Sequence, residues 1–135
     1  MAQNSIRKCG PVQMVTVDEL DDEALIACSA MMGAPTVMVE KIPSGEEIVI
    51  AFKALENYIG KKLYATMSAE AGGLNSAMPF GVAAELGIPL VDADLMGRAF
   101  PELQMVTATL YGISATPMSM ADEKGNTCIL NTVNN

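Results

Sequence analysis

The segment IPLVDADLMGRAFPELQ, residues 88–104, gives the strongest structural signal in the chain. Its first four residues are an apolar run short enough to be a buried strand. Acidic and turn-forming residues follow at once, beginning with Asp92 and Asp94. If the chain stays extended past Val91, these two carboxylates point to the same side, where they repel each other unless a cation, a shared proton or hydrogen-bond donors hold them. Arg98 is the nearest candidate cation.

The flanking segments alternate between helix and strand patterns. Residues 44–47, Ser-Gly-Glu-Glu, have the capping-box spacing, in which the Ser hydroxyl accepts from the amide three residues on and the last Glu reaches back. A helix is therefore predicted from there to Gly60, a residue type common just after helices. A strand over residues 63–67 and a helix over residues 77–86 follow, with Pro79 near the first turn of that helix.

The C-terminal third predicts one more helix and a hairpin. The helix runs over residues 100–111 and stops at Gly112. Residues 116–121 and 126–130 read as two strands of a hairpin that turns at Asp-Glu-Lys-Gly. Because helices and strands alternate with short connections, the predicted fold class is α/β: a mainly parallel sheet flanked by helices, with a C-terminal β-hairpin.

The N-terminal third is less regular. Residues 1–10 are polar and are predicted to be a loose segment, so that residues 11–135 form a single α/β domain. Residues 12–17 and 24–30 are predicted strands separated by an acidic turn. Residues 37–41 fit either a short helix or extended chain.

Composition excludes several classes of function. A net charge of −8, with only 8 Lys and Arg, argues against nucleic-acid or anionic membrane surfaces. No apolar run is long enough to span a bilayer and no signal peptide is visible, which predicts a soluble, cytoplasmic protein. Three widely spaced Cys argue against a disulfide framework, and the absence of His excludes catalytic pairs and metal sites that need it.

Ligands of open parallel sheets bind beyond the carboxyl ends of the strands. Two segments reach that edge; they carry Glu70, Gly72, Gly73 and Asn75 after one strand, and Asp92, Asp94, Arg98 and Glu102 after the other. In one interpretation these acids bind a divalent cation or activate water. In the other, the two Asp side chains cap a turn while Arg98 and Glu102 pair along a helix. Gly33, in the segment Met31-Met-Gly-Ala-Pro35, fits either an apolar pocket or a plain turn.

Four segments together resemble the N-terminal domain of the S-methyl thiohydantoin desulfurase family. They are MMGAPTVMVEKIPSG from Met31, EAGGLNSAMPF from Glu70, LGIPLVDADLMGRAFPELQM from Leu86, and TPMSMADEKGN from Thr116. The resemblance implies an α/β domain that precedes a mostly β C-terminal domain, so that the chain is expected to be a fragment of a longer two-domain architecture. It implies that water replaces the sulfur substituent of a hydantoin-like cyclic ureide.

Two hypotheses follow for the function. In the first, the chain is the α/β domain of a hydrolase-like enzyme acting on hydantoin or thiohydantoin rings. Asp92, Asp94 and Glu70 then bind a divalent metal ion or position water, Arg98 stabilises an oxyanion or holds a carboxylate, and Glu102 orients Arg98. The substrate site consists of Glu70, Gly72, Gly73, Asn75 and Gly33. In the second, the chain is a non-catalytic small-molecule-binding or homo-oligomerising domain, whose apolar surface meets a missing C-terminal domain or a partner chain.

Overall fold

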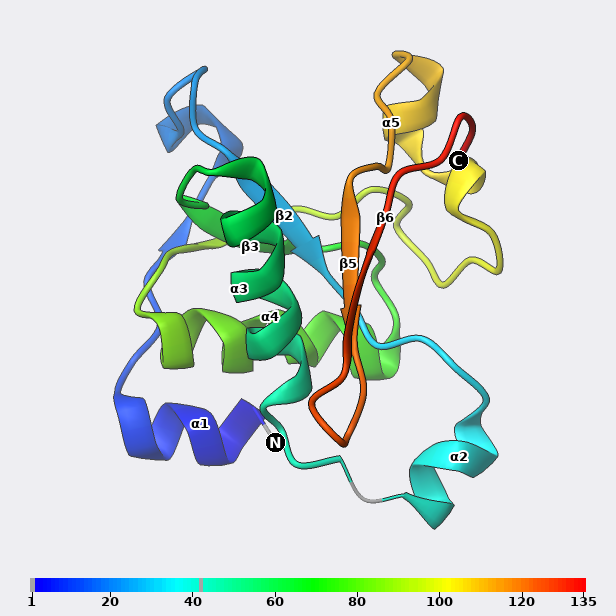
Figure 1. The fold of residues 1–135 in the computed structure, drawn as a ribbon. Coiled ribbons are helices and arrows are strands. Elements are labelled where there is room, and N and C mark those ends of the chain that lie inside the picture. The colour runs from blue at the N-terminus through cyan, green and yellow to red at the C-terminus, as the bar shows by residue number, and fades with distance from the viewer. Residues whose placement is uncertain (1, 42) are drawn as a thin grey trace.

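A four-stranded parallel sheet forms the centre of the molecule (Figure 1). The computed structural model describes residues 2–41 and 43–135. The strands are β1 (Met14–Val15), β2 (Ile26–Ser29), β3 (Ala65–Ser68) and β4 (Leu90–Val91). Their order is β1-β4-β3-β2, and each neighbouring pair is parallel. The predicted α/β class is therefore confirmed, and β3 and β4, whose loops carry the predicted site, are neighbours.

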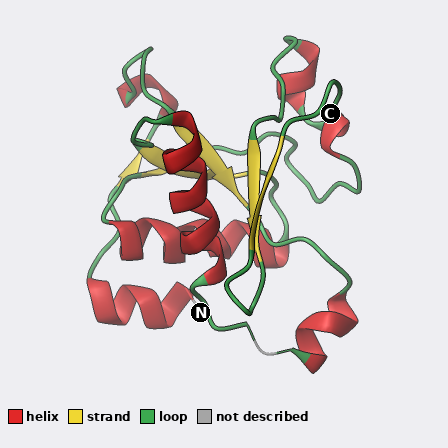
Figure 2. Ribbon diagram, viewed as in Figure 1, coloured by secondary structure: helices red, strands yellow, loops and turns green. Residues whose placement is uncertain are grey.

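Helices flank the sheet, and an antiparallel hairpin follows it in the chain (Figure 2). The helices are α1 (Ala2–Cys9), α2 (Pro35–Glu40), α3 (Glu47–Ile59), α4 (Gly73–Leu86) and α5 (Thr107–Leu110), with 3₁₀ turns η1 (Val17–Glu19) and η2 (Leu103–Met105). The hairpin pairs β5 (Met118–Ala121) with β6 (Thr127–Leu130), which confirms its prediction. Among the described residues, no helix is both long and apolar enough to cross a membrane.

The core lies on both faces of the sheet because side chains alternate along each strand. On one face, Ala27 of β2 packs with Phe52 of α3 and Val82 of α4, and Phe52 is only 4% exposed. On the other face, Val15, Ala65 and Val91 from three strands form a second cluster, partly covered by Leu20. Strand β3, which contains the fully buried Ala65, thus runs between two apolar clusters. This packing sets the position of the polar residues that follow the carboxyl end of β3.

The best-predicted helix is α3. The Glu47 carboxylate accepts from the amides of Ser44 at 2.6 Å and Gly45 at 2.8 Å, as the reach-back half of a capping box requires. The Ser44 hydroxyl accepts from the amide of Glu46 rather than from that of Glu47. Gly60 ends the helix with φ +67°, a left-handed conformation that glycine adopts without strain.

The N-terminal segment differs from its prediction. Residues 2–9 form α1, which packs along α4, instead of a loose segment. The Ser5 hydroxyl donates to the Glu85 carboxylate at 2.6 Å, and Gly81 faces the start of α1, where a Cβ would lie in ordinary contact at 3.6 Å from the Cα of Ala2. The polar composition that suggested a loose segment is the solvent-facing side of a short helix.

Two helix boundaries were predicted wrongly. The helix predicted over residues 77–86 begins four residues earlier, at Gly73, so that Pro79 lies inside α4 and not in its first turn. The helix predicted over residues 100–111 is broken into η2 and α5, because Val106 is extended and buried between them. The amide of Thr107 donates to the carbonyl of Leu95 at 2.8 Å, which pulls the chain toward the loop after β4.

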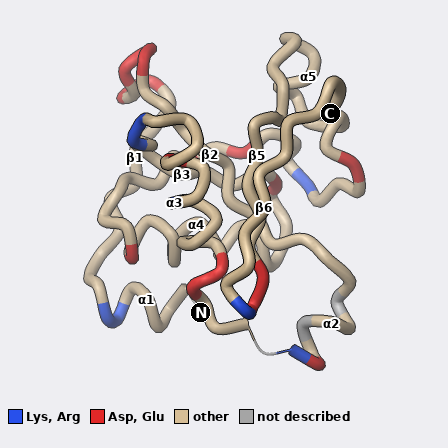
Figure 3. The backbone as a smooth tube through the Cα atoms, in the orientation of Figure 1, with Lys and Arg blue, Asp and Glu red and all other residues tan. Residues whose placement is uncertain are grey.

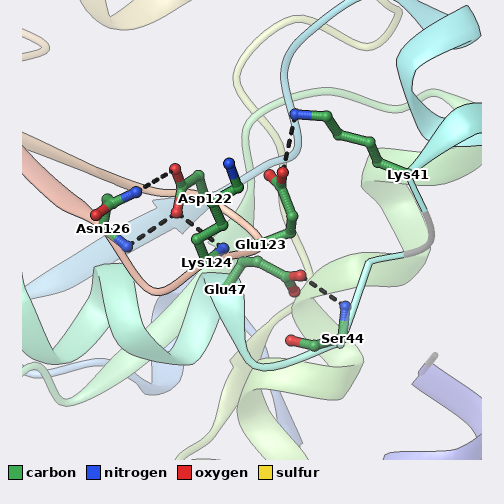
Figure 4. Close-up of polar contacts among 7 residues, drawn as sticks. All are labelled: Lys41, Ser44, Glu47, Asp122, Glu123, Lys124 and Asn126. Carbon is green, nitrogen blue, oxygen red and sulfur yellow. Dashed lines mark hydrogen bonds and ion pairs between the residues drawn. The ribbon is translucent and has the colours of Figure 1, made fainter.

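The undecided segment at residues 37–41 belongs largely to α2, which ends at Glu40. From there the chain is tied to the hairpin, because Lys41 Nζ lies 2.8 Å from Glu123 Oε1 (Figure 4). The hairpin is also fixed to α3, since the Ser119 hydroxyl donates to the carbonyl of Ala51 at 2.7 Å. These contacts set the hairpin beside α3.

Candidate functional site

A cavity of about 380 Å³ opens at the carboxyl ends of β3 and β4. Three of the four carboxylates predicted for the site, Glu70, Asp92 and Asp94, line it. The remaining wall consists of Met14, Ser68, Ala71, Ser76, Pro79, Phe80, Leu90, Val91 and Ala93. The sheet topology thus brings together the loop after β3, the loop after β4 and the first turns of α4, as expected for a parallel sheet.

Asp94 joins the two loops through backbone amides. Its Oδ2 accepts from the amides of Gly97 at 2.5 Å and Met96 at 3.1 Å in its own loop, and from the amide of Ala71 at 3.0 Å in the loop after β3. Partial burial raises the pKa of Asp94, but these hydrogen bonds outweigh it and leave the pKa below its ordinary value. Asp94 is therefore an ionised cap that fixes the loops.

Glu70 and Asn75 connect three loops. The Asn75 side chain accepts from the amide of Met31 at 2.8 Å and donates to its carbonyl at 3.1 Å, so it binds the segment after β2 at two points. It also donates to Glu70 Oε1 at 2.9 Å. The other oxygen of Glu70 accepts from the amide of Phe100 at 3.1 Å, in the loop after β4. Both residues were predicted to bind substrate, and the structure uses them to hold backbone.

Ser68 explains how α4 contains an internal proline. Pro79 has no N–H, so the carbonyl of Asn75, four residues earlier, loses its helical partner. The Ser68 hydroxyl, at the end of β3, donates to that carbonyl at 3.1 Å and to the carbonyl of Glu70 at 2.5 Å. The sequence analysis missed Ser68. A proline four residues after Asn75 was the signal, because it predicts a free carbonyl that some nearby donor must satisfy.

Asp92 differs from the other two carboxylates. Its backbone amide donates to the carbonyl of Val15 at 2.8 Å, which extends the pairing of β4 with β1. Its side chain is exposed at the cavity, and no hydrogen bond or ion pair to it occurs within residues 2–41 and 43–135. Asp92 is thus the cavity carboxylate whose oxygens remain available to a ligand.

Arg98 and Glu102 do not enter the cavity. The Arg98 guanidinium donates to the carbonyl of Ala99 at 3.1 Å, and Glu102 accepts from the side-chain amide of Gln104. In the part of the chain that the structure describes, Arg98 forms no ion pair with Glu102 or with the two Asp residues. The predicted pairing of Arg98 and Glu102 is wrong because residues 98–102 are not helical, so the four-residue spacing does not bring the side chains together.

The predicted glycines have separate positions. Gly72 is the residue before α4 and Gly73 is its first residue, next to Ser76, which lines the cavity and whose hydroxyl donates to the carbonyl of Gly72. Gly33 lies elsewhere, in the wall of a second and larger hollow. None of the three predicted glycines therefore lines the small cavity, although Gly72 and Gly73 adjoin it at the start of α4.

The predicted metal-binding set does not fit a metal ion in this arrangement. Asp94 and Glu70 already accept hydrogen bonds from three and two N–H donors, respectively. Among the residues that are described, no group of three or more His, Cys, Asp or Glu side chains is placed to hold a metal ion. The N–H donors to Asp94 and Glu70 offset part of the repulsion expected between the neighbouring acids.

The second hollow is an open groove of about 1060 Å³ between β2, α3, the hairpin and the segment around α5. Its walls include Phe52, Leu55 and Ile113, and its rim includes Lys41 and Glu123. The three cysteines are free, and Cys28 and Cys128 line this groove. These two concave regions of the described chain differ in character: one is small and acidic, and the other is large and mainly apolar.

Comparisons with known proteins agree on one relationship. A family model described as S-Me-THD-like, N-terminal domain, matches residues 1–132. An X-ray crystal structure of a protein from Chromobacterium violaceum is 35% identical in sequence and superposes with a TM-score of 0.78. The match covers 90% of this chain and 32% of that protein, so the chain spans about a third of the length of its structural relative. No curated protein matches the chain.

Proposed function

The chain belongs to the family of S-Me-THD-like N-terminal domains, and from this premise we propose that it is the α/β domain of a hydrolase-like enzyme acting on S-methyl thiohydantoin or related cyclic ureides. The observation that carries the proposal is the position of Asp92. It lies at the carboxyl ends of parallel strands, lines a cavity of about 380 Å³, and is not engaged by the described part of the chain. That volume falls within the roughly 300–1,000 Å³ of small-molecule sites.

A cyclic ureide offers groups that match this cavity. Its ring N–H donates to a carboxylate, and its ring carbonyl accepts from a hydroxyl or an amide. Asp92 supplies the acceptor, and Ser76, whose hydroxyl proton is already bound to the Gly72 carbonyl, adds a second acceptor oxygen to the wall. The N-terminus of α4 also carries partial positive charge, which favours an electron-rich oxygen nearby. The ligand class therefore follows from the hydrogen-bonding groups of the wall.

In the proposed reaction, Asp92 acts as the general base toward water. The water oxygen forms a bond to the ring carbon that bears the S-methyl group while Asp92 takes a water proton. The carbon–sulfur bond then breaks, and methanethiolate leaves with the proton that Asp92 returns. The second water proton ends on the ring nitrogen, so the products are a hydantoin carbonyl and methanethiol. No oxidant or reductant is needed.

Asp94 and Glu70 act as positioning residues in this proposal. Because they bind backbone amides from the loops after β3 and β4, they hold the cavity walls in place without touching the reacting atoms. Pre-positioned walls lower the reorganisation that accompanies the chemical step. This division of roles predicts that replacing Asp92 affects catalysis or binding, and that replacing Asp94 or Glu70 affects stability as well.

The test is titration of the chain with an S-methyl thiohydantoin, followed by NMR, with methanethiol release measured in parallel. We expect shifts at the amides of residues 92–94 and 76. We expect Asp92→Asn to weaken binding or release at least about tenfold, the scale of one lost charged hydrogen bond. Asp18→Asn is the matched control, since Asp18 is an exposed acid in η1. Shifts confined to residues outside the cavity contradict the proposal.

A binding-only domain is the second candidate function, because Asp92 is the cavity carboxylate that remains available to a ligand among the described residues. In that case the ligand binds at Asp92 but methanethiol is not released, even when the chain is supplied with the rest of a longer family member. Binding with turnover supports the hydrolase, and binding without turnover supports the second candidate.

A further inference from the structure

We propose that the large groove and the adjoining uncharged segment are the docking surface for the domain that follows this one in longer members of the family. The groove of about 1060 Å³ runs between β2, α3 and the hairpin, and its walls include Phe52, Ile113 and Met118. An opening of this size is at or above the roughly 300–1,000 Å³ of small-molecule sites, so a protein surface fits it better than a single small ligand.

The segment along one side of the groove is apolar and unprotected. Residues 103–121 contain no charged residue. Within them Leu110 is 83% exposed, Tyr111 82% and Ile113 60%, and Ile113 also lines the groove. In Figure 3, α5 and the strands β5 and β6 are tan, and charged residues lie at the turn that joins the two strands. Large exposed apolar side chains grouped in this way mark interaction surfaces.

The position of Asn135 indicates which part of a longer protein would cover the groove. Asn135 lines the groove, and its side chain accepts from the amide of Ala115 at 2.7 Å and donates to the carbonyl of Ile113 at 3.4 Å. Val133, two residues earlier, is 99% exposed. The end of the described chain therefore lies against α5 (Figure 1). In a relative whose chain continues from this point, the following residues start at the groove itself.

The comparisons indicate that relatives are longer than the matched region. The family model describes an N-terminal domain, and about two-thirds of the Chromobacterium violaceum protein lies outside the region that this chain matches. A following domain is thus present in the family and is delivered to the groove by chain connectivity. Such tethering raises the effective concentration of the second domain, so the two domains remain bound even when the apolar contact between them is modest.

Charge disfavours a second copy as the occupant. Each chain carries a net charge of −8, and the groove wall contains Glu47, Asp122 and Glu123 against Lys41. Two such acidic rims repel each other when they are brought together. The surface instead suits a partner face that is apolar at its centre and carries Lys or Arg at its edge.

The test compares amide hydrogen exchange in this chain with exchange in the full-length Chromobacterium violaceum protein. We expect the region aligned with residues 107–121 to exchange at least about tenfold more slowly in the longer protein, because docking removes local opening. The region aligned with α1 lies away from the groove and serves as the internal reference. Equal exchange of residues 107–121 in the two proteins, after scaling to α1, overturns the proposal.

A variant pair keeps the test independent of differences in overall stability. Ile113→Asp in this chain leaves its melting temperature nearly unchanged, since Ile113 is already 60% exposed. The matching change in the longer protein lowers the melting temperature or separates unfolding into two transitions. Tyr64→Ser, at a 50% exposed tyrosine outside the groove, is the control for both proteins. Sedimentation of this chain as a dimer that Ile113→Asp dissociates assigns the surface to a second copy and overturns the proposal.

Discussion

The two concave regions of this domain are built in opposite ways. At the carboxyl ends of β3 and β4, Asp94, Glu70 and Asn75 each bind backbone groups of neighbouring loops, and Asp92 is the cavity carboxylate without a partner among the described residues. In the groove beside the hairpin, the walls are mainly apolar. The first region is complete within this domain. The second region exposes apolar surface to water, which is unfavourable in free energy.

The two regions also differ in what they need for stability. Loops that leave a parallel sheet expose backbone amides and carbonyls, and each buried group needs a partner. Short polar side chains next to glycine supply those partners locally, so the cavity needs nothing from outside. An apolar groove gains free energy only when another surface covers it. We therefore expect substitutions in the first region to act on the isolated chain, and substitutions in the second to act only in a larger assembly.

The largest loss of stability is expected for Asn75→Ala, in the first region. The change removes both bonds to the backbone of Met31 and the bond to Glu70. Because it leaves partly buried groups without partners, we expect it to lower the free energy of unfolding by about 2–3 kcal/mol. Urea denaturation measures the change. Asn131→Ala, at an exposed residue bonded to Tyr58, is the control, and an equal loss in both variants would contradict the special role of Asn75.

A second prediction separates the two neighbouring aspartates. Asp94→Asn weakens three bonds from backbone amides, and we expect it to cost about 1–2 kcal/mol of unfolding free energy. Asp92→Asn touches no such bond, and we expect a change within about 0.5 kcal/mol, as for ordinary surface substitutions. The same urea denaturation experiments decide it. Equal effects would show that the loops do not depend on Asp94.

The role of Asp94 also predicts how the unfolding free energy depends on pH. The pKa of folded Asp94 lies below the ordinary value of 3.8, so its ionised form stabilises the fold at pH values above the unfolded pKa. This contribution is lost as the pH falls through the folded pKa. We expect the unfolding free energy of the natural chain to decrease on acidification in that range, and to decrease less steeply in Asp94→Asn. Parallel slopes for the two proteins would rule out Asp94 as a contributor.

The smallest effect is expected at the ion pair between Lys41 and Glu123, on the rim of the groove (Figure 4). The Lys41 side chain is 56% exposed, and water and salt screen pairs of this kind. We expect Lys41→Met to change stability less than any variant above, and the difference to vanish at high salt. Denaturation at low and high salt measures it. A large loss would mean that polar contacts also hold the groove side together.

Local sequence signals predicted much of the fold. The Glu47 reach-back and Gly60 stop defined α3, because caps act on the residues beside them. The hairpin was also correct, since its turn residues lie together in the chain. The predictions were wrong where contacts between distant residues override local preference. Val106 is buried in the core, and the helix predicted over residues 100–111 is split there. Residues 2–9 form α1, which packs on α4.

For the candidate site, the sequence predicted the place and much of the residue set. Parallel-sheet topology was enough to bring Glu70, Asp92 and Asp94 to one cavity. Their division of roles was not predictable, because it depends on which carboxylate meets amides from the adjacent loop. The position of Arg98 outside the cavity likewise depends on the path of residues 95–102, for which the sequence has no periodic signal.

The sequence by itself determined the family, the α/β class, the parallel pair of strands and the acidic edge, because these follow from periodicity, caps and motifs within short stretches. Only the tertiary structure decided that Asp94 and Glu70 hold backbone while Asp92 faces the cavity, and that an uncharged segment borders an open groove. The physical reason is that a hydrogen-bond partner or an apolar cover can come from any part of the chain. Which part supplies it is settled only when the loops are packed in space.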